Sequence, residues 1–292
     1  MRLRVIDVTP MGERLIASYL ILLGDTAVLI DTGPHSTWRR VYDAVRSEGA
    51  RLEWIILTHI HLDHAGASGA LARMFPGVKV LVHPRGARHI VNPEKLWSAS
   101  RSVLGPVADL YGKPEPVPEG SVVSAEDGYV VEVGGERFRI LHTPGHASHH
   151  MSIYLERHGL MFLGDSAGIV IEYEGEVVQL PSTPPPFKPD AYLNSVERMI
   201  ESMPREAAPG HYGTIVDATD YLRMHLGEVK RWIDAVKSAL EEGITGIDKV
   251  AEYVANHVPT ASKLYSSSNP VISKMFYYGT IWGLVEALKP SS

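Results

Sequence analysis

The chain has 292 residues, of which 45% are apolar, so it can bury a sizeable core as one large domain or as a catalytic domain with an appendage. Its formal net charge of -6 argues against the basic surface that nucleic-acid binding requires, so we expect no nucleic-acid partner. The chain contains no cysteine, which excludes disulfides and thiolate metal ligands.

Residues near the two ends of the sequence are candidates for a secretory signal or a membrane-spanning segment. Residues 1–8 alternate like a strand and lack the long apolar core of a secretory signal, so we expect a cytoplasmic protein. Near the C-terminus, the apolar stretch 275–285 is too short to cross a bilayer. We therefore expect no membrane partner and interpret this stretch as a core or interface helix.

The first third of the chain predicts strands joined by tight turns. Residues 15–23 and 27–30 are two apolar runs on either side of Gly24 and Asp25, a spacing typical of a β-hairpin. Apolar residues then recur at helical spacing over a segment that ends before Gly49, which we expect to be its C-cap. This helix is predicted over residues 37–48. The pattern that follows predicts a strand at 52–57, a helix at 65–75 and a strand at 78–82.

Residues 84–120 interrupt this pattern. They are rich in proline and glycine but include a stretch, 94–111, that looks helical. We interpret residues 84–120 as an insertion that covers the functional site of the protein. Further strands are predicted at residues 129–133, 137–141, 151–155 and 160–163. After the proline-rich connector 181–186, the spacing becomes helical over residues 192–203, 218–242, 247–257 and 270–288. These periodicities alone predict an α/β or α+β protein.

The most informative stretch directly follows the apolar run 54–57. It places His59, His61, Asp63 and His64 within one turn, at the end of a predicted buried strand. Imidazole nitrogens and carboxylate oxygens suit zinc, iron or manganese. A single histidine would more often be a packing or surface residue, but four clustered ligand types favour a hydrolytic or redox metal centre.

Four other acidic residues or histidines stand in comparable motifs. His146 lies after a Pro-Gly turn, Asp165 ends an apolar strand in Gly-Asp, and His211 lies in the segment Pro-Gly-His-Tyr-Gly. Earlier in the chain, Asp31 ends a strand in the segment Leu-Ile-Asp-Thr-Gly. Together with the H-x-H-x-D-H pattern, these motifs resemble, in order, those of the metallo-β-lactamase superfamily over residues 1–215.

The resemblance implies an αββα sandwich, in which two mixed sheets lie face to face with helices outside. We expect residues 1–216 to form this catalytic domain and residues 217–292 to form a helical C-terminal appendage. In relatives, extra C-terminal helices border the substrate pocket or form a dimer interface. A homodimer through these helices is therefore an expectation.

Carried over residue by residue, the resemblance also implies a site for two divalent metal ions, with zinc expected and iron or manganese as alternatives. His59, His61 and His146 would hold one ion, Asp63, His64 and His211 the second, and Asp165 would bridge both. A hydroxide that bridges the ions would be the nucleophile, and Asp63 would orient it and pass a proton to the leaving group. Asp31 would either bond a ligating imidazole or cap its own loop.

Several reactions stay open within this family. We expect a metal-dependent hydrolase of a small-molecule ester, lactone, thioester or phosphotriester, with a promiscuous site. One alternative is a glyoxalase II-type hydroxyacylglutathione hydrolase, although its glutathione-binding residues do not map onto the C-terminal third. The other is a persulfide dioxygenase with one iron, which metal content would distinguish. Trp97 and Tyr192 would suit a hydrophobic substrate, and Tyr212 either reaches a substrate oxygen or lies in the wall or core.

Overall fold

The structure of the protein, a computed structural model, describes residues 1–10, 14–173, 176–211 and 213–289. Its first sheet has the strand order β1-β2-β3-β4-β5-β6, with antiparallel pairing from β1 to β3 and parallel pairing from β3 to β6. The strands are β1 (Arg2–Asp7), β2 (Ala17–Leu23), β3 (Thr26–Ile30), β4 (Arg51–Ile56), β5 (Lys79–Val82) and β6 (Val122–Ser124). The predicted hairpin between β2 and β3 is confirmed, and Gly24 in its turn has a left-handed φ of 67°.

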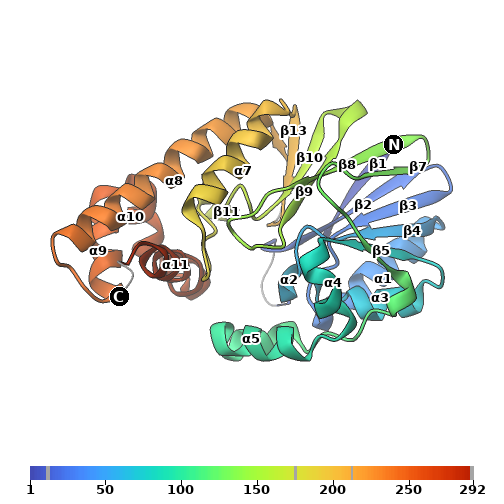
Figure 1. The fold of residues 1–292 in the computed structure, drawn as a ribbon, viewed down its shortest axis with the longest axis horizontal. Coiled ribbons are helices and arrows are strands. Elements are labelled where there is room, and N and C mark those ends of the chain that lie inside the picture. Colours follow the sequence, from blue (N-terminus) through green and yellow to red (C-terminus); the bar gives the residue numbers. More distant parts are fainter. Residues whose placement is uncertain (11–13, 174–175, 212, 290–292) are drawn as a thin grey trace. The chain divides into compact units, whose positions relative to one another are not determined.

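Among the described residues, the second sheet also has six strands, in the order β14-β13-β10-β9-β8-β7, and only β10 and β13 pair in parallel within it. The strands are β7 (Val130–Val133), β8 (Glu136–His142), β9 (Met151–Leu155), β10 (Leu160–Gly164), β13 (Glu206–Pro209) and β14 (Ile215–Val216). Figure 1 shows this sheet in green to orange beside the blue and cyan first sheet. The predicted strands between residues 129 and 163 are confirmed.

Successive side chains of β2 point to opposite faces of the first sheet, and both faces are buried. Tyr19 and Ile21 join Phe138 and Phe162 of the second sheet in one apolar cluster, so this cluster lies between the two sheets. Leu20, like other residues that point the opposite way, joins a second cluster with the helices on the outer face. The predicted α/β sandwich of two facing sheets is therefore confirmed.

The helices on the outer face of the first sheet agree in part with those predicted from the sequence. They are α1 (Trp38–Glu48), α2 (Leu62–Ala65), α3 (Ser68–Met74), α4 (Pro84–Val91), α5 (Glu94–Leu104) and α6 (Pro106–Tyr111). The helix predicted over 65–75 is confirmed as α3, although it begins three residues later, after a break that separates it from α2. The helix predicted over 94–111 is two helices, because Gly105 has φ 55° and Pro106 begins α6.

The chain divides into two compact units. The first contains both large sheets and consists of Met1–His142, His149–Gly164 and Glu206–Val216. The second consists of Thr143–Ser148, Asp165–Arg205 and Asp217–Ser292. The predicted boundary between residues 216 and 217 stays a prediction, as does the covering role of residues 84–120.

Helices dominate the second unit. Its elements are β11 (Ile169–Tyr173), β12 (Glu176–Leu180), α7 (Pro189–Glu201), α8 (Ala218–Glu241), α9 (Ile247–His257), α10 (Pro259–Tyr265), the π-helix η4 (Val271–Tyr277) and α11 (Tyr278–Leu288). The long α8 confirms the helix predicted over 218–242, whereas the helix predicted over 270–288 begins as the π-helix and continues as α11. Among the described residues, no helix is both long and apolar enough to cross a membrane.

Candidate metal centre

The H-x-H-x-D-H loop lies where parallel strands of the first sheet end. β4 ends at Ile56, and the backbone N–H of Leu57 still bonds the carbonyl of Leu81 on β5, at 2.9 Å. β3 lies parallel to β4 on its other side, so Asp31, directly after β3, comes next to the loop. Carboxyl ends of parallel strands meet at one edge, which brings residues far apart in the sequence together.

Asp31 accepts hydrogen bonds from three donors of this loop. Its Oδ1 accepts from the backbone N–H of Thr58 at 2.7 Å, and its Oδ2 from the Thr58 hydroxyl at 2.8 Å. The same Oδ2 lies 2.9 Å from Nδ1 of His64. Asp31 is buried and has a φ of 54°, a backbone conformation that is uncommon for residues other than glycine. It therefore contacts an imidazole proposed as a ligand.

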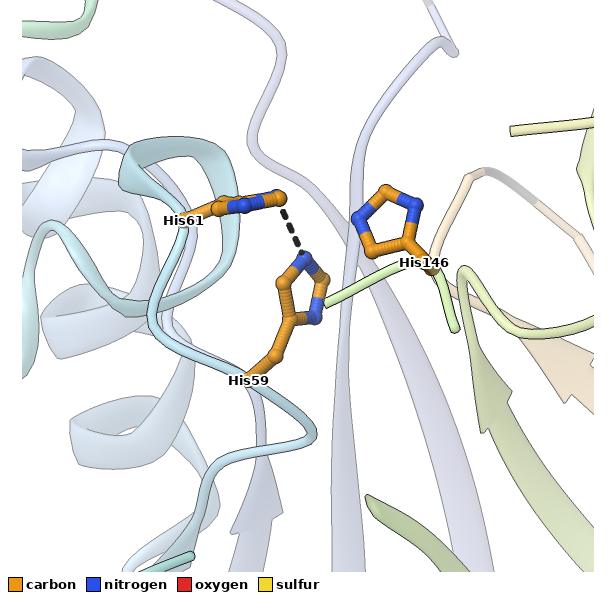
Figure 2. Close-up of side chains that lie close together, drawn as sticks. All are labelled: His59, His61 and His146. Carbon is orange, nitrogen blue, oxygen red and sulfur yellow. Dashed lines mark hydrogen bonds between the residues drawn. The ribbon is translucent and has the colours of Figure 1, made fainter. Parts of the chain in front are cut away.

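The Thr58 hydroxyl determines which nitrogen of His59 carries the proton. Its single hydrogen is donated to the Asp31 carboxylate, which can only accept. Because Nδ1 of His59 lies 3.0 Å from the same hydroxyl oxygen, it must be the donor there. The Nε2 of His59 then holds the lone pair, and it lies 3.0 Å from Nδ1 of His61 (Figure 2).

Backbone or carboxylate acceptors set two further imidazoles of this unit, those of His64 and His211, in the same way. Nδ1 of His64 donates to Asp31, and Nδ1 of His211, directly after Gly210, donates to the carbonyl of Leu15 at 2.6 Å. Both rings therefore present Nε2 as the nitrogen that can bind a metal. Ligand atoms of Asp63, His64 and His211 lie within 4.8 Å of one another, which suits one divalent ion.

The second unit holds the other two predicted ligands. Nδ1 of His146 lies 3.0 Å from the carbonyl of Ser182, which can only accept, so His146 also presents Nε2. That Nε2 lies 3.6 Å from Oδ2 of Asp165, and the Ser182 hydroxyl donates to the same Oδ2 at 3.2 Å. Both ligands are nearly inaccessible, with 3% and 4% of their surface exposed.

This donor set fits divalent metal ions. Four imidazoles have Nδ1 committed to a hydrogen-bond acceptor, which is the usual arrangement of metal-binding histidines, and the carboxylates of Asp63 and Asp165 add oxygen ligands. Asp165 is buried, and a bound cation would offset the cost of taking its carboxylate charge out of water.

The candidate substrate residues lie in different surroundings. Tyr192 is fully buried, and its hydroxyl lies 3.3 Å from the carbonyl of Asp165 and 2.8 Å from Nε2 of His225, so it contacts the protein interior. Trp97 is half-buried on α5, with the Arg101 guanidinium 5.8 Å from its ring. Tyr212 lies outside the described residues, and a substrate role for all three stays a prediction.

Thr58, Ser182 and His149 were not predicted as site residues. Thr58 and Ser182 are hydrogen-bonding partners of imidazoles, and such a role has no residue-type signal in the sequence. His149 packs its ring 5.7 Å from that of His61. Burial, together with the nearby His61, lowers the pKa of His149 to about 3, so this ring is neutral at physiological pH.

The fold and the site together define a class: a two-sheet α/β sandwich with imidazoles and carboxylates gathered at its strand ends, typical of metal-dependent hydrolases. The chain belongs to the metallo-beta-lactamase superfamily, whose family model matches residues 11–211. This confirms the family that the sequence motifs predicted.

Known proteins support this membership. The chain is similar to the metallo-beta-lactamase fold-containing protein ST1585 of Sulfurisphaera tokodaii, at 34% identity over 56% of this chain and 62% of that protein. The crystal structure of ST1585 superposes with a TM-score of 0.70 at 25% identity, and the match covers 98% of this chain and 97% of that chain.

Two more distant matches have names that state an activity or a bound metal. One is an atrochrysone carboxyl ACP thioesterase of Claviceps purpurea, at 25% identity over 80% of this chain and 65% of that protein. The other is the structure of TTHA1623 in a di-iron-bound form, with a TM-score of 0.51 at 26% identity over 72% of this chain and 94% of that chain. The chain thus spans less than two thirds of ST1585 and of the thioesterase in the sequence matches.

Proposed function

We propose that this protein is a hydrolase with two divalent metal ions that acts on a small carboxylic ester, lactone or thioester, with phosphotriesters as a further class. The observation that carries this proposal is the common orientation of four imidazoles, those of His59, His64, His146 and His211, each of which commits Nδ1 to an acceptor and presents Nε2. Structural histidines have no need of such uniformity, whereas metal ligands do.

The proposed ligand sets follow the motifs. His59, His61 and His146, whose side chains Figure 2 draws, would hold the first ion, and Asp63, His64 and His211 would hold the second. Asp165 would bridge the two ions. Zinc suits this nitrogen and oxygen set, and the di-iron form of TTHA1623 supports iron as the alternative metal.

Two ions bound there would supply Lewis acidity and lower the pKa of a water towards neutrality. The protein itself would manage the protons. Asp63 is the candidate for this role, because its side chain is 18% exposed, whereas the side chain of the adjacent His64 is fully buried. An accessible carboxylate at the start of α2 can accept a proton from the attacking water and pass it to the leaving group.

The substrate class is proposed from both chemistry and similarity. Carboxylic esters, lactones and thioesters share a carbonyl that the same site can polarise. The name of the Claviceps purpurea relative adds weight to thioesters, because that protein is a thioesterase. A thioester of a carrier or of glutathione therefore belongs among the first substrates to test.

The test is kcat/KM on full-length protein whose metal content has been quantified. The panel consists of a glutathione thioester, an acyl-carrier thioester, several lactones, aryl esters and a phosphotriester. Turnover of any of these that rises with metal content up to two ions per chain supports the proposal. Oxygen uptake with glutathione persulfide at one iron per chain, without hydrolysis, would replace it with the dioxygenase alternative.

A further inference from the structure

Ser182 touches both proposed ligands of the second unit with different atoms. Its backbone carbonyl accepts from Nδ1 of His146 at 3.0 Å, and its hydroxyl donates to Oδ2 of Asp165 at 3.2 Å. Ser182 itself is only 4% exposed. A displacement of Ser182 would therefore change the tautomer or the orientation of the His146 imidazole. It would also change which oxygen of the Asp165 carboxylate is available to a metal ion.

The residues on either side of Ser182 are fixed by the C-terminal helix α11. The hydroxyl of Thr183 donates to the carbonyl of Thr280 at 2.8 Å, and the hydroxyl of Thr280 donates to the carbonyl of Pro181 at 2.8 Å. These reciprocal bonds hold the segment 181–183 at two points. Both threonines are buried, so water cannot easily replace either bond.

The helix also approaches this segment too closely for any side chain at one position. A Cβ atom added at Gly283 would lie 1.4 Å from the carbonyl oxygen of Thr183, which is backbone and cannot turn aside. Gly279, one turn earlier on the same helix, has nothing within 4 Å of such an atom. Glycine at 283 is therefore required for the contact between α11 and the segment 181–183.

We propose that Ser182 is a positioning residue for the metal centre, which orients His146 and Asp165 together, and that α11 fixes Ser182 in place. This inference rests on the proposed function, in which His146 and Asp165 are metal ligands. It gives the C-terminal helices a role beyond bordering a pocket or forming a dimer, because the last helix of the chain then supports ligands that precede it by more than a hundred residues.

The experiment measures metal retention rather than turnover. Full-length wild-type protein and Ser182→Ala are loaded with Zn²⁺, and the rate of Zn²⁺ release to a chromogenic chelator is followed. Partners of metal ligands typically contribute 10–100-fold to metal affinity, so we expect release from Ser182→Ala to be faster by about that factor. Ser182→Thr keeps the hydroxyl and should restore slow release.

Ser273→Ala is the matched control, because the hydroxyl of this buried serine donates to the backbone carbonyl of Asn269, at 3.1 Å, and not to a proposed ligand. It should release Zn²⁺ at the wild-type rate. The visible spectrum of Co²⁺-loaded protein gives a second readout, since it reports the geometry of the ligands. We expect it to change in Ser182→Ala and to stay unchanged in Ser273→Ala.

The helix is tested with a matched glycine pair. Gly283→Ala should accelerate Zn²⁺ release, whereas Gly279→Ala should not. If Gly283→Ala does not fold, Thr280→Val removes only the hydroxyl that bonds Pro181 and should show the same effect.

Two results would overturn the proposal in different ways. If wild-type protein holds Zn²⁺ and Ser182→Ala releases it at the same rate, the positioning role is wrong while the metal centre stands. If wild-type protein retains no divalent ion, the proposed function fails and this inference fails with it.

Discussion

Asp31→Asn is the substitution that tests most directly how the site presents its imidazoles. Asparagine tolerates the left-handed backbone of this position, where φ is 54°, so the change isolates the side-chain chemistry. Its amide oxygen can still accept from the backbone N–H of Thr58. Its NH₂ group would replace the Oδ2 oxygen that now lies 2.9 Å from Nδ1 of His64. Two donors would then face each other.

Either response to that conflict weakens metal binding. If the proton of His64 moves to Nε2, the nitrogen that would bind the metal loses its lone pair. If the proton stays, a buried charge-assisted hydrogen bond is lost, which costs about 1.5–3 kcal/mol. We therefore expect affinity for the ion at Asp63, His64 and His211 to fall about 10–100-fold, equivalent to about 1.4–2.7 kcal/mol.

The assay is competition with a chelator of known affinity, followed at equilibrium on protein whose fold is checked by circular dichroism. Asp7→Asn is the control, because this carboxylate accepts from the backbone N–H groups of Thr9 and Arg14, at 3.0 and 3.1 Å, rather than from an imidazole. Wild-type metal affinity in a folded Asp31→Asn variant would refute the reasoning that Asp31 sets the tautomer of His64.

Asp165→Asn, at the proposed bridging position, is expected to lower metal occupancy and to cut turnover by orders of magnitude with the fold intact; near wild-type activity would refute the two-metal assignment. Asp63→Asn is expected to lower kcat by about 10²–10⁴-fold at matched metal content, because the amide cannot carry the proton; an unchanged kcat would exclude that role. Burial lowers the pKa of His225 to about 3, so this ring is neutral when folded but protonates below about pH 6.5 when unfolded. Its contribution to stability is present above that pH and is lost towards pH 3, by up to about 1.4 kcal/mol per pH unit, so urea unfolding should depend less on pH in His225→Phe; equal dependence would contradict the neutral buried ring.

The breaks between α5 and α6 and between α2 and α3 differ in their causes, and the prediction of one helical stretch over residues 94–111 missed the first although its signal is local. The break between α5 and α6 coincides with Gly105 and Pro106, and proline cannot donate the helical hydrogen bond. The break after α2 has no proline. A Cβ atom at Gly66 would meet the carbonyl oxygen of Leu62 in the preceding turn and would also lie 2.8 Å from the backbone nitrogen of His35, so a segment about thirty residues earlier also requires glycine there. Only the folded chain contains that contact.

The same distinction separates the ligands from the residues that orient them. A ligand must be histidine or a carboxylate, so its residue type and its place after a strand are visible in the sequence. An orienting partner only has to supply an acceptor or a hydroxyl, and backbone carbonyls such as those of Leu15 and Ser182 do so whatever their side chains. Ser182 is 36 residues from His146 and 17 from Asp165, in a proline-rich segment that contains no ligand types. Because these partners would determine which nitrogen faces a metal ion, we expect a chain that keeps every ligand of the motif to lose the site when a distant contact, such as that of Gly283 with Thr183, is disturbed.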